Sequence, residues 1–196
     1  MSEVLLYHHV QGLTQGVRSF ADELRQAGHT VHTPDLFDGR TFGTLEEGMT
    51  FAREAGFDTL GERGVAAADG IGPNVVYAGF SLGVMIAQQL AQTRPGARGA
   101  LLLYSCLPVS EFGNAWPDGV PVQVHGKDGD EFFLEDIDAA RALVDSRDGA
   151  ELFLYPGTEH LFADSSLPAY DPAATALLTE RVLAFLDKVQ AGEKKD

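Results

Sequence analysis

One stretch near the middle of the chain constrains the fold more than any other. It begins with the apolar, largely β-branched residues 75–78 (VVYA), passes through residues 79–83 (GFSLG) and continues as a run of small and apolar residues to Ala91. The first part predicts a buried strand and the last part a helix. A G-x-S-x-G pattern between a strand and a helix is typical of a nucleophile elbow, a sharp turn that exposes its central serine. Ser81 is therefore the candidate nucleophile.

The residues beside Ser81 suit such a turn. Gly79 and Gly83 have no Cβ, so a strand and a helix can pass close to each other there. The backbone N–H of Leu82 would lie at the helix N-terminus, where it lacks an intrahelical partner and the helix dipole favours negative charge. We expect this N–H to donate to the oxyanion of an acyl-transfer reaction. The alternative is a Gly-Ser turn that only joins a strand to a helix.

Six strand-like segments alternate with helical ones along the chain. The strands are expected near residues 3–8, 29–33, 75–78, 100–104, 120–125 and 151–155, with helices that include 17–27, 45–55, 58–69, 137–146 and 171–190. This alternation predicts an α/β fold with a mostly parallel six-stranded sheet and helices on both faces. Ligands bind such sheets outside the carboxyl ends of the strands, so the loops after the strands are the expected site.

Two of those loops contain the partners that a serine nucleophile needs. His160 follows the sixth strand, and Asp128 and Asp130 follow the fifth. The order Ser, Asp, His is that of the α/β-hydrolases. The histidine would take the serine proton, and one aspartate would orient the imidazole. We expect the backbone N–H of Val10, after the first strand, to be the second oxyanion donor.

Composition excludes several classes of protein. The chain has 196 residues and a formal net charge of −15, so neither nucleic acid nor an anionic membrane is an expected partner. No apolar run approaches the ~20 residues of a membrane-spanning helix, and the N-terminus lacks the features of a signal peptide. The single cysteine, Cys106, excludes an internal disulfide. We expect a cytoplasmic protein with one domain over residues 1–190 and a tail at 191–196; a homodimer is compatible with the sequence.

No cofactor and no metal is expected. The loop after the first strand has neither a G-x-G-x-x-G nor a G-x-x-x-x-G-K-[ST] pattern, which argues against a flavodoxin-like nucleotide binder. His8 and His9 are adjacent on a strand and should point to opposite faces, which argues against a shared metal. Residues 38–72 show no strand pattern and are expected to form a helical cap over the pocket. The candidates for its lining are Phe42, Met49, Phe51 and Trp116, with Arg40 as a candidate carboxylate clamp.

Over nearly its whole length the chain resembles the dienelactone hydrolases of the α/β-hydrolase superfamily. The resemblance lies in residues 8–13 (HHVQGL), 28–29 (GH), 34–39 (PDLFDG), the elbow, and 160–162 (HLF). It implies an α/β-hydrolase fold with strand order 2-1-3-4-5-6 and cleavage of a small ester or lactone. The family's acid lies in a D-x-F-V type of sequence, which residues 130–133 (DEFF) match better than residues 128–131 (DGDE), so we choose Asp130 over Asp128.

Two residues depart from the family pattern. Founding members have cysteine as the nucleophile where this chain has Ser81, and an acidic residue where it has His9. The family's thiolate switch therefore does not carry over, and the role of His9 is left open. We predict a cofactor-free serine hydrolase that acts through an acyl-enzyme, with Ser81, His160 and Asp130 as its triad. The alternative is a small-molecule-binding domain that has the same fold without the chemistry.

Overall fold

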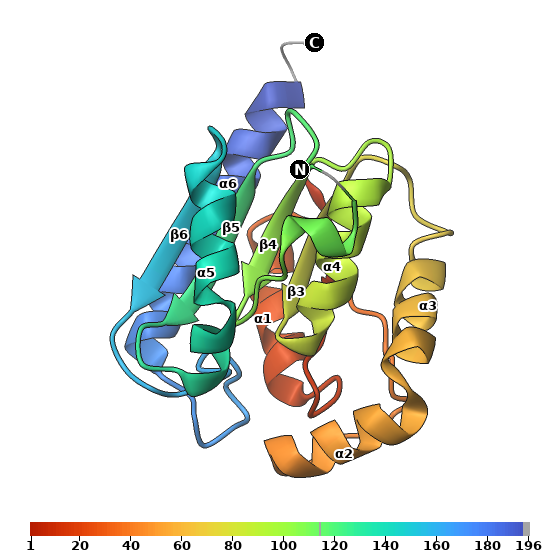
Figure 1. Cartoon of the computed structure of the whole chain (residues 1–196), viewed down its shortest axis with the longest axis vertical. Coiled ribbons are helices and arrows are strands. Elements are labelled where there is room, and N and C mark those ends of the chain that lie inside the picture. Colours follow the sequence, from red (N-terminus) through yellow and green to blue (C-terminus); the bar gives the residue numbers. More distant parts are fainter. Residues whose placement is uncertain (114, 194–196) are drawn as a thin grey trace.

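The computed structural model describes residues 1–113 and 115–193, in which six strands and six α-helices follow one another along the chain (Figure 1). The strands are β1 Glu3–Tyr7, β2 Thr30–His32, β3 Val75–Phe80, β4 Gly99–Leu103, β5 Val122–Lys127 and β6 Ala150–Tyr155. The helices are α1 Gln15–Gln26, α2 Leu45–Ala55, α3 Phe57–Ala67, α4 Leu82–Thr93, α5 Glu131–Asp145 and α6 Pro172–Glu193, with a 3-10 turn at Val109–Glu111. Helices α2 and α3 are consecutive, and among the described residues only the 3-10 turn lies between β4 and β5. Within the described ranges, no helix is both long and apolar enough to span a bilayer.

The strands form one sheet in the order β2-β1-β3-β4-β5-β6, and every pairing is parallel. In the register of the sheet, Val4 of β1 lies between Val31 of β2 and Val76 of β3. The predicted fold class and strand order are confirmed. Because all strands run the same way, the loops that follow them meet at one edge of the sheet.

Successive residues of β1 contribute to two apolar clusters, one on each face of the sheet. Val4 and Leu6 pack in the cluster that includes α1 and α6, whereas Leu5 and Tyr7 pack in the cluster that includes α3, α4 and α5. This alternation follows from the two-residue period of a strand. Figure 1 shows α4 and α5 on one face of the sheet and α1 and α6 on the other. Burial on both faces fixes the register of the central strands.

The turn between β3 and α4 is strained and closely packed. Ser81 has φ 50° and ψ −109°, a left-handed conformation that residues with side chains rarely adopt. A Cβ on Gly79 would overlap the backbone of Gly83, and a Cβ on Gly83 would lie 2.5 Å from the carbonyl oxygen of Tyr7. The Ser81 N–H donates to the Leu103 carbonyl at 2.7 Å. The conformation of the serine therefore depends on the close approach that the two glycines permit.

Helix α2 packs against the loop that follows β1. Thr44 and Glu47 form the predicted capping box at its start, with the Glu47 N–H donating to the Thr44 hydroxyl at 3.2 Å. In Figure 1, α2 lies beyond the carboxyl ends of the strands. A Cβ on Gly48 would overlap the Val10 carbonyl, so only glycine lets α2 approach this backbone so closely.

Two helices differ in length from the expectation. Helix α5 begins at Glu131 rather than near residue 137, because the Asp130 carboxylate caps it by accepting from the Phe132 N–H at 3.1 Å and Phe133 is buried. Helix α6 continues to Glu193, beyond its expected end near residue 190. Of the expected tail, residues 194–196 lie outside the described residues.

We expect Gly83→Ala to lower the free energy of unfolding by about 1–3 kcal/mol, because the new methyl group meets the rigid backbone of β1. Gly72→Ala is the matched control, since a Cβ there meets no atom within 4 Å. Urea unfolding followed by circular dichroism compares the two variants. Equal stabilities would contradict the close packing that we assign to the elbow.

Candidate active site

Three side chains from three loops meet at the carboxyl edge of the sheet. The Ser81 hydroxyl donates to His160 Nε2 at 3.0 Å, and the His160 Nδ1–H donates to Asp130 Oδ2 at 2.6 Å. Ser81 comes from the β3–α4 turn, Asp130 from the β5–α5 loop and His160 from the loop after β6. The structure thus joins the three residues singled out in the sequence by two consecutive hydrogen bonds. Such a chain can pass a proton from the hydroxyl to the imidazole.

The two candidate acids have different surroundings. Asp130 is fully buried, and its second carboxylate oxygen accepts from the Phe132 N–H as the N-cap of α5. This N-cap contact holds the side chain in place at the start of α5. Asp128 is exposed and accepts from the Gly157 N–H at 3.1 Å. The geometry therefore pairs His160 with Asp130 and leaves Asp128 to connect two loops.

The loop that contains His160 is held by a buried lysine. Lys127 Nζ donates to Glu159 Oε2 and to Asp171 Oδ2, both at 2.7 Å. Asp171 in turn accepts from backbone N–H groups in the first turn of α6. From the sequence, the fifth strand is expected to end at residue 125, which places Lys127 in a Gly/Asp loop where a lysine is ordinarily exposed, whereas in the structure β5 continues to Lys127 and buries it. Its burial follows from two acidic residues that lie far from it in sequence.

Backbone strain is concentrated around the histidine. In the described part of the chain, four non-glycine residues have a positive φ, and three of them lie at this site: Ser81 at 50°, Tyr104 at 71° and Leu161 at 60°. The Tyr104 ring meets the His160 ring edge-on at 5.6 Å between centroids, and the Phe132 ring lies 4.9 Å away on the same measure. Strained backbone that packing holds in place is common at functional sites.

Ser81 and His160 open into a pocket of about 570 Å³. Leu45, Met49 and Phe132 give it an apolar part, and its charged lining residues are Glu46, Arg53, Glu135 and Asp136. Helix α2 supplies four of these at helical spacing: Leu45, Glu46, Met49 and Arg53. Met49 is a lining residue as expected. The pocket is therefore bounded by α2 on one side and by the start of α5 on another.

The other residues expected around the pocket lie elsewhere. Phe42 and Phe51 pack on Phe37, at 6.0 Å and 4.9 Å between ring centroids. Trp116 is buried, and its indole N–H donates to the Val120 carbonyl at 2.8 Å. The Arg40 guanidinium lies over the Phe51 ring at 5.1 Å, and Arg53 is the arginine that lines the pocket. Apolar packing, rather than ligand contact, determines where these aromatic rings lie.

The two expected oxyanion donors lie close to Ser81, one in the pocket lining and one next to Ser81 in the chain. Val10 is a lining residue, and Leu82 is the first residue of α4, immediately after Ser81. Within residues 1–113 and 115–193, neither N–H donates to a protein group. Both are therefore free to bind a developing negative charge.

The two adjacent histidines after β1 do not form part of a metal cluster. His8 Nε2 accepts from the Leu36 N–H at 3.0 Å, and His9 Nε2 lies 2.8 Å from Asp164 Oδ2. Among the residues that the structure describes, no three side chains suited to metal binding come together.

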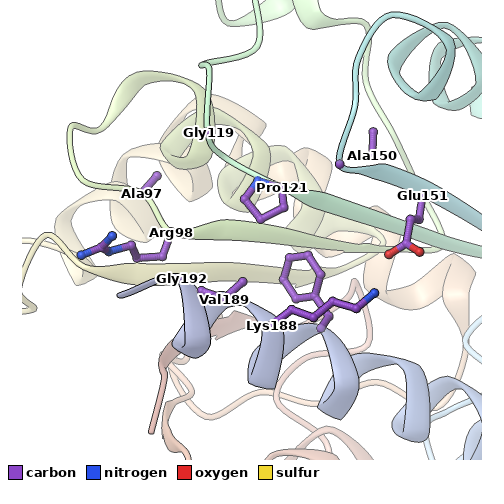
Figure 2. Close-up of a pocket in the computed structure, with 11 residues that line it drawn as sticks. Ala97, Arg98, Gly119, Pro121, Ala150, Glu151, Lys188, Val189 and Gly192 are labelled. Carbon is purple, nitrogen blue, oxygen red and sulfur yellow. The ribbon is translucent and has the colours of Figure 1, made fainter. Parts of the chain in front are cut away.

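A second hollow of about 510 Å³ lies at the amino ends of the strands, beside α6 (Figure 2). It is lined by residues that precede or begin strands, among them Arg98, Pro121 and Ala150, and by Lys188 and Val189 of α6. Since Ser81 follows the carboxyl end of β3, the two hollows are at opposite ends of the strands. Ser81, His160 and Asp130 do not line the second hollow.

Solved structures with the same fold include several hydrolases. A dienelactone hydrolase-like promiscuous phosphotriesterase from metagenomic libraries is 17% identical at a TM-score of 0.75, covering 96% of this chain and 87% of that chain. Dienelactone hydrolase from Anabaena variabilis is 19% identical at a TM-score of 0.67, and the match covers 96% of this chain and 86% of that chain. A thioesterase domain from the curacin biosynthetic pathway is 15% identical at a TM-score of 0.64, and the match covers 93% of this chain and 90% of that chain. Among curated proteins, none matches the chain.

These neighbours and the sheet order define an α/β-hydrolase fold. The chain belongs to the dienelactone hydrolase family, whose model matches residues 2–190. The predicted family is therefore confirmed. Membership implies a hydrolase that acts on a small-molecule ester or lactone.

Two buried histidines are expected to make the free energy of unfolding depend on pH. Burial lowers the pKa of His8 to about 4 and that of His125 to about 3, from an ordinary value of 6.5. Below pH 6.5 the unfolded chain binds protons at these positions that the folded protein excludes, so the free energy of unfolding falls as the pH falls toward 4. We expect His125→Gln to weaken this dependence between about pH 7 and about pH 5.

Urea unfolding at several pH values measures this dependence. His32→Gln is the control, because His32 is partly exposed and contacts Glu3 at the edge of the sheet. If His125→Gln and His32→Gln both kept the wild-type dependence, burial of His125 would not contribute to it.

Proposed function

We propose that this protein is a cofactor-free serine hydrolase that cleaves small esters or lactones through an acyl-enzyme. One observation is central: the Ser81 hydroxyl, the His160 imidazole and the Asp130 carboxylate are joined at 3.0 Å and 2.6 Å next to a pocket. A serine hydroxyl is a weak nucleophile until an adjacent base takes its proton. His160 is within hydrogen-bond reach for that step.

In acylation, Ser81 Oγ attacks the substrate carbonyl while His160 Nε2 accepts the hydroxyl proton. Asp130 keeps the imidazole in the tautomer with its proton on Nδ1 and stabilises the imidazolium that forms. The carbonyl oxygen becomes an oxyanion, which the N–H groups of Val10 and Leu82 stabilise. The imidazolium then gives its proton to the departing alcohol oxygen, and the acyl group stays on Ser81.

In deacylation, water takes the place of the alcohol. His160 Nε2 accepts a proton from water as the water oxygen attacks the acyl carbonyl, and the same two N–H groups stabilise the second oxyanion. Collapse of this intermediate releases the acid and returns the proton to Ser81. For a lactone, the alcohol and the acid are two ends of one product.

The pocket favours a small substrate without negative charge. Its volume of about 570 Å³ suits a compact ligand, with Leu45, Met49 and Phe132 beside the apolar part. Three carboxylates, those of Glu46, Glu135 and Asp136, share this lining with the guanidinium of Arg53. An excess of negative charge disfavours binding of an anion. We assign the segment 38–72, which contains α2 and α3, as a cap over this pocket within a single domain.

The proposal predicts hydrolysis of p-nitrophenyl esters in a series from acetate to octanoate. Wild type should release p-nitrophenol, and Ser81→Ala should lower kcat by about 10⁴-fold or more while leaving the folded state intact. The chain length that gives the highest kcat/KM reports the depth of the pocket. Equal turnover by wild type and Ser81→Ala would contradict the assignment of the nucleophile.

A matched pair of variants tests the acid in the same assay. Asp130→Asn should lower kcat by about 10⁴-fold, because the neutral amide no longer favours the required tautomer of His160. Asp128→Asn should retain turnover, because its carboxylate contacts only loop backbone. The reverse order of effects would exchange the roles of the two residues.

A further inference from the structure

His9 is a buried histidine that the proposed triad does not use. Its ring is fully enclosed, so both nitrogens need protein partners. The Gln11 N–H points at His9 Nδ1 at 3.2 Å, and Nδ1 must therefore be the acceptor. The ring proton then lies on Nε2, which donates to Asp164 Oδ2 at 2.8 Å. These two partners select a single tautomer.

His8 has the opposite tautomer. Because the Leu36 N–H donates to His8 Nε2 at 3.0 Å, the ring proton lies on Nδ1, which donates to the His9 carbonyl at 2.8 Å. The Gly12 N–H donates to the same carbonyl at 3.0 Å. Burial lowers the pKa of His8 to about 4, which keeps the ring neutral, as an accepting Nε2 requires.

These contacts act on the Val10 N–H through one peptide unit. The His9 carbonyl and the Val10 N–H belong to the same planar group and point in opposite directions. Two donors on the carbonyl therefore set the direction of the N–H. Asp164 also fixes the imidazole of His9, so neither the backbone carbonyl nor the side chain of His9 is free to rotate.

Asp164 connects this peptide to the loop that contains His160. It is fully buried, and its Oδ2 also accepts from the Thr14 hydroxyl at 2.5 Å. Its Oδ1 accepts from the N–H and the hydroxyl of Ser166, at 2.9 Å and 2.6 Å. Burial opposes ionisation of this carboxyl, but the hydrogen bonds from His9, Ser166 and Thr14 hold its pKa below the ordinary value. A Cβ on Gly16 would overlap this carboxylate, so α1 also confines it.

We propose that His9 and Asp164 form a second histidine–aspartate pair, which orients the Val10 N–H toward the oxyanion of the reaction catalysed by Ser81. This inference rests on the proposed function, since it assigns the pair a role in that reaction. Both are positioning residues: no hydrogen bond joins either of them to Ser81, His160 or Asp130 within the described chain. The pair ties the loop of the oxyanion donor to the loop of the base.

The contact with Asp164 also explains why position 9 has a histidine rather than an acidic residue. Glutamate in place of His9 would face the Asp164 carboxylate in a fully buried space, and two carboxylates that share such a site cannot both ionise. With an aspartate at position 164, the residue at position 9 must therefore be a hydrogen-bond donor.

The test compares His9→Leu, His9→Gln and Asp164→Asn in the p-nitrophenyl ester assay. His9→Leu removes the donor, and we expect kcat to fall by about 10²-fold with KM nearly unchanged, as expected when an oxyanion donor is misplaced. His9→Gln retains an N–H near Nε2 and should recover a large part of this loss. Asp164→Asn removes the carboxylate that selects the tautomer and should lower kcat as His9→Leu does.

Two further readouts separate positioning from general destabilisation. The affinity of a boronic acid, which forms a tetrahedral anion on an active-site serine, should fall in parallel with kcat, whereas the affinity of the product acid should not change. The pH–kcat profile should keep the wild-type pKa of the base, because the contact between His160 and Asp130 is intact. His32→Leu, which removes the donor from a partly exposed histidine–carboxylate contact of the same 2.8 Å length, should leave kcat, the boronic acid affinity and the pH–kcat profile unchanged.

The outcomes distinguish the two proposals. If wild type and Ser81→Ala behaved alike, the proposed function would fail. If turnover depended on Ser81 while folded His9→Leu and Asp164→Asn both kept wild-type kcat and boronate affinity, the role of the pair would be overturned. Should His9→Leu not fold, Asp164→Asn decides the question, since a loss of kcat with an unchanged pH profile supports positioning and wild-type kcat overturns it.

Discussion

The close contact between the backbones of β1, β3 and α4 is the constraint on which the site depends. Gly79 and Gly83 lie where a Cβ would overlap neighbouring backbone, so the chain can turn from β3 into α4 within a single residue. That residue is Ser81, and the turn forces it to a φ of 50°. Strain of this kind persists only where surrounding structure over-determines it. The buried faces of the parallel sheet supply that structure.

The same edge of the sheet brings together residues that are distant in sequence. Asp130 is held as the N-cap of α5, and the loop of His160 is held by Lys127 through Glu159. The loop of Val10 is held from two directions, by α2 at Gly48 and by the contact of His9 with Asp164. Each of the proposed reacting groups is thus positioned by a contact outside the reaction itself, which is what preorganised catalysis requires.

The fold class could be predicted from local patterns in the sequence, namely the alternation of apolar strands with helices and a G-x-S-x-G turn between them. The strand order and the family were predicted from the resemblance to the dienelactone hydrolases. The choice of Asp130 over Asp128 rested on the same resemblance, since residues 130–133 match the family's acid motif better. Contacts between distant segments have no such signal in the sequence. Asp164 lies in a loop rich in small polar residues, where an aspartate ordinarily forms a turn, and its burial depends on α1 and on His9. Trp116 was expected at the pocket, but packing places it in the core.

The most direct test of a reactive Ser81 is covalent labelling by a fluorophosphonate, followed by mass spectrometry of the intact protein and of its peptides. An activated serine displaces fluoride and keeps the phosphonyl group, whereas an ordinary surface serine does not react at a comparable rate. We predict one added phosphonyl group on folded wild type, located on Ser81, with labelling strongly slowed in His160→Ala. A folded protein that gained no label, or gained it on another residue, would contradict the account.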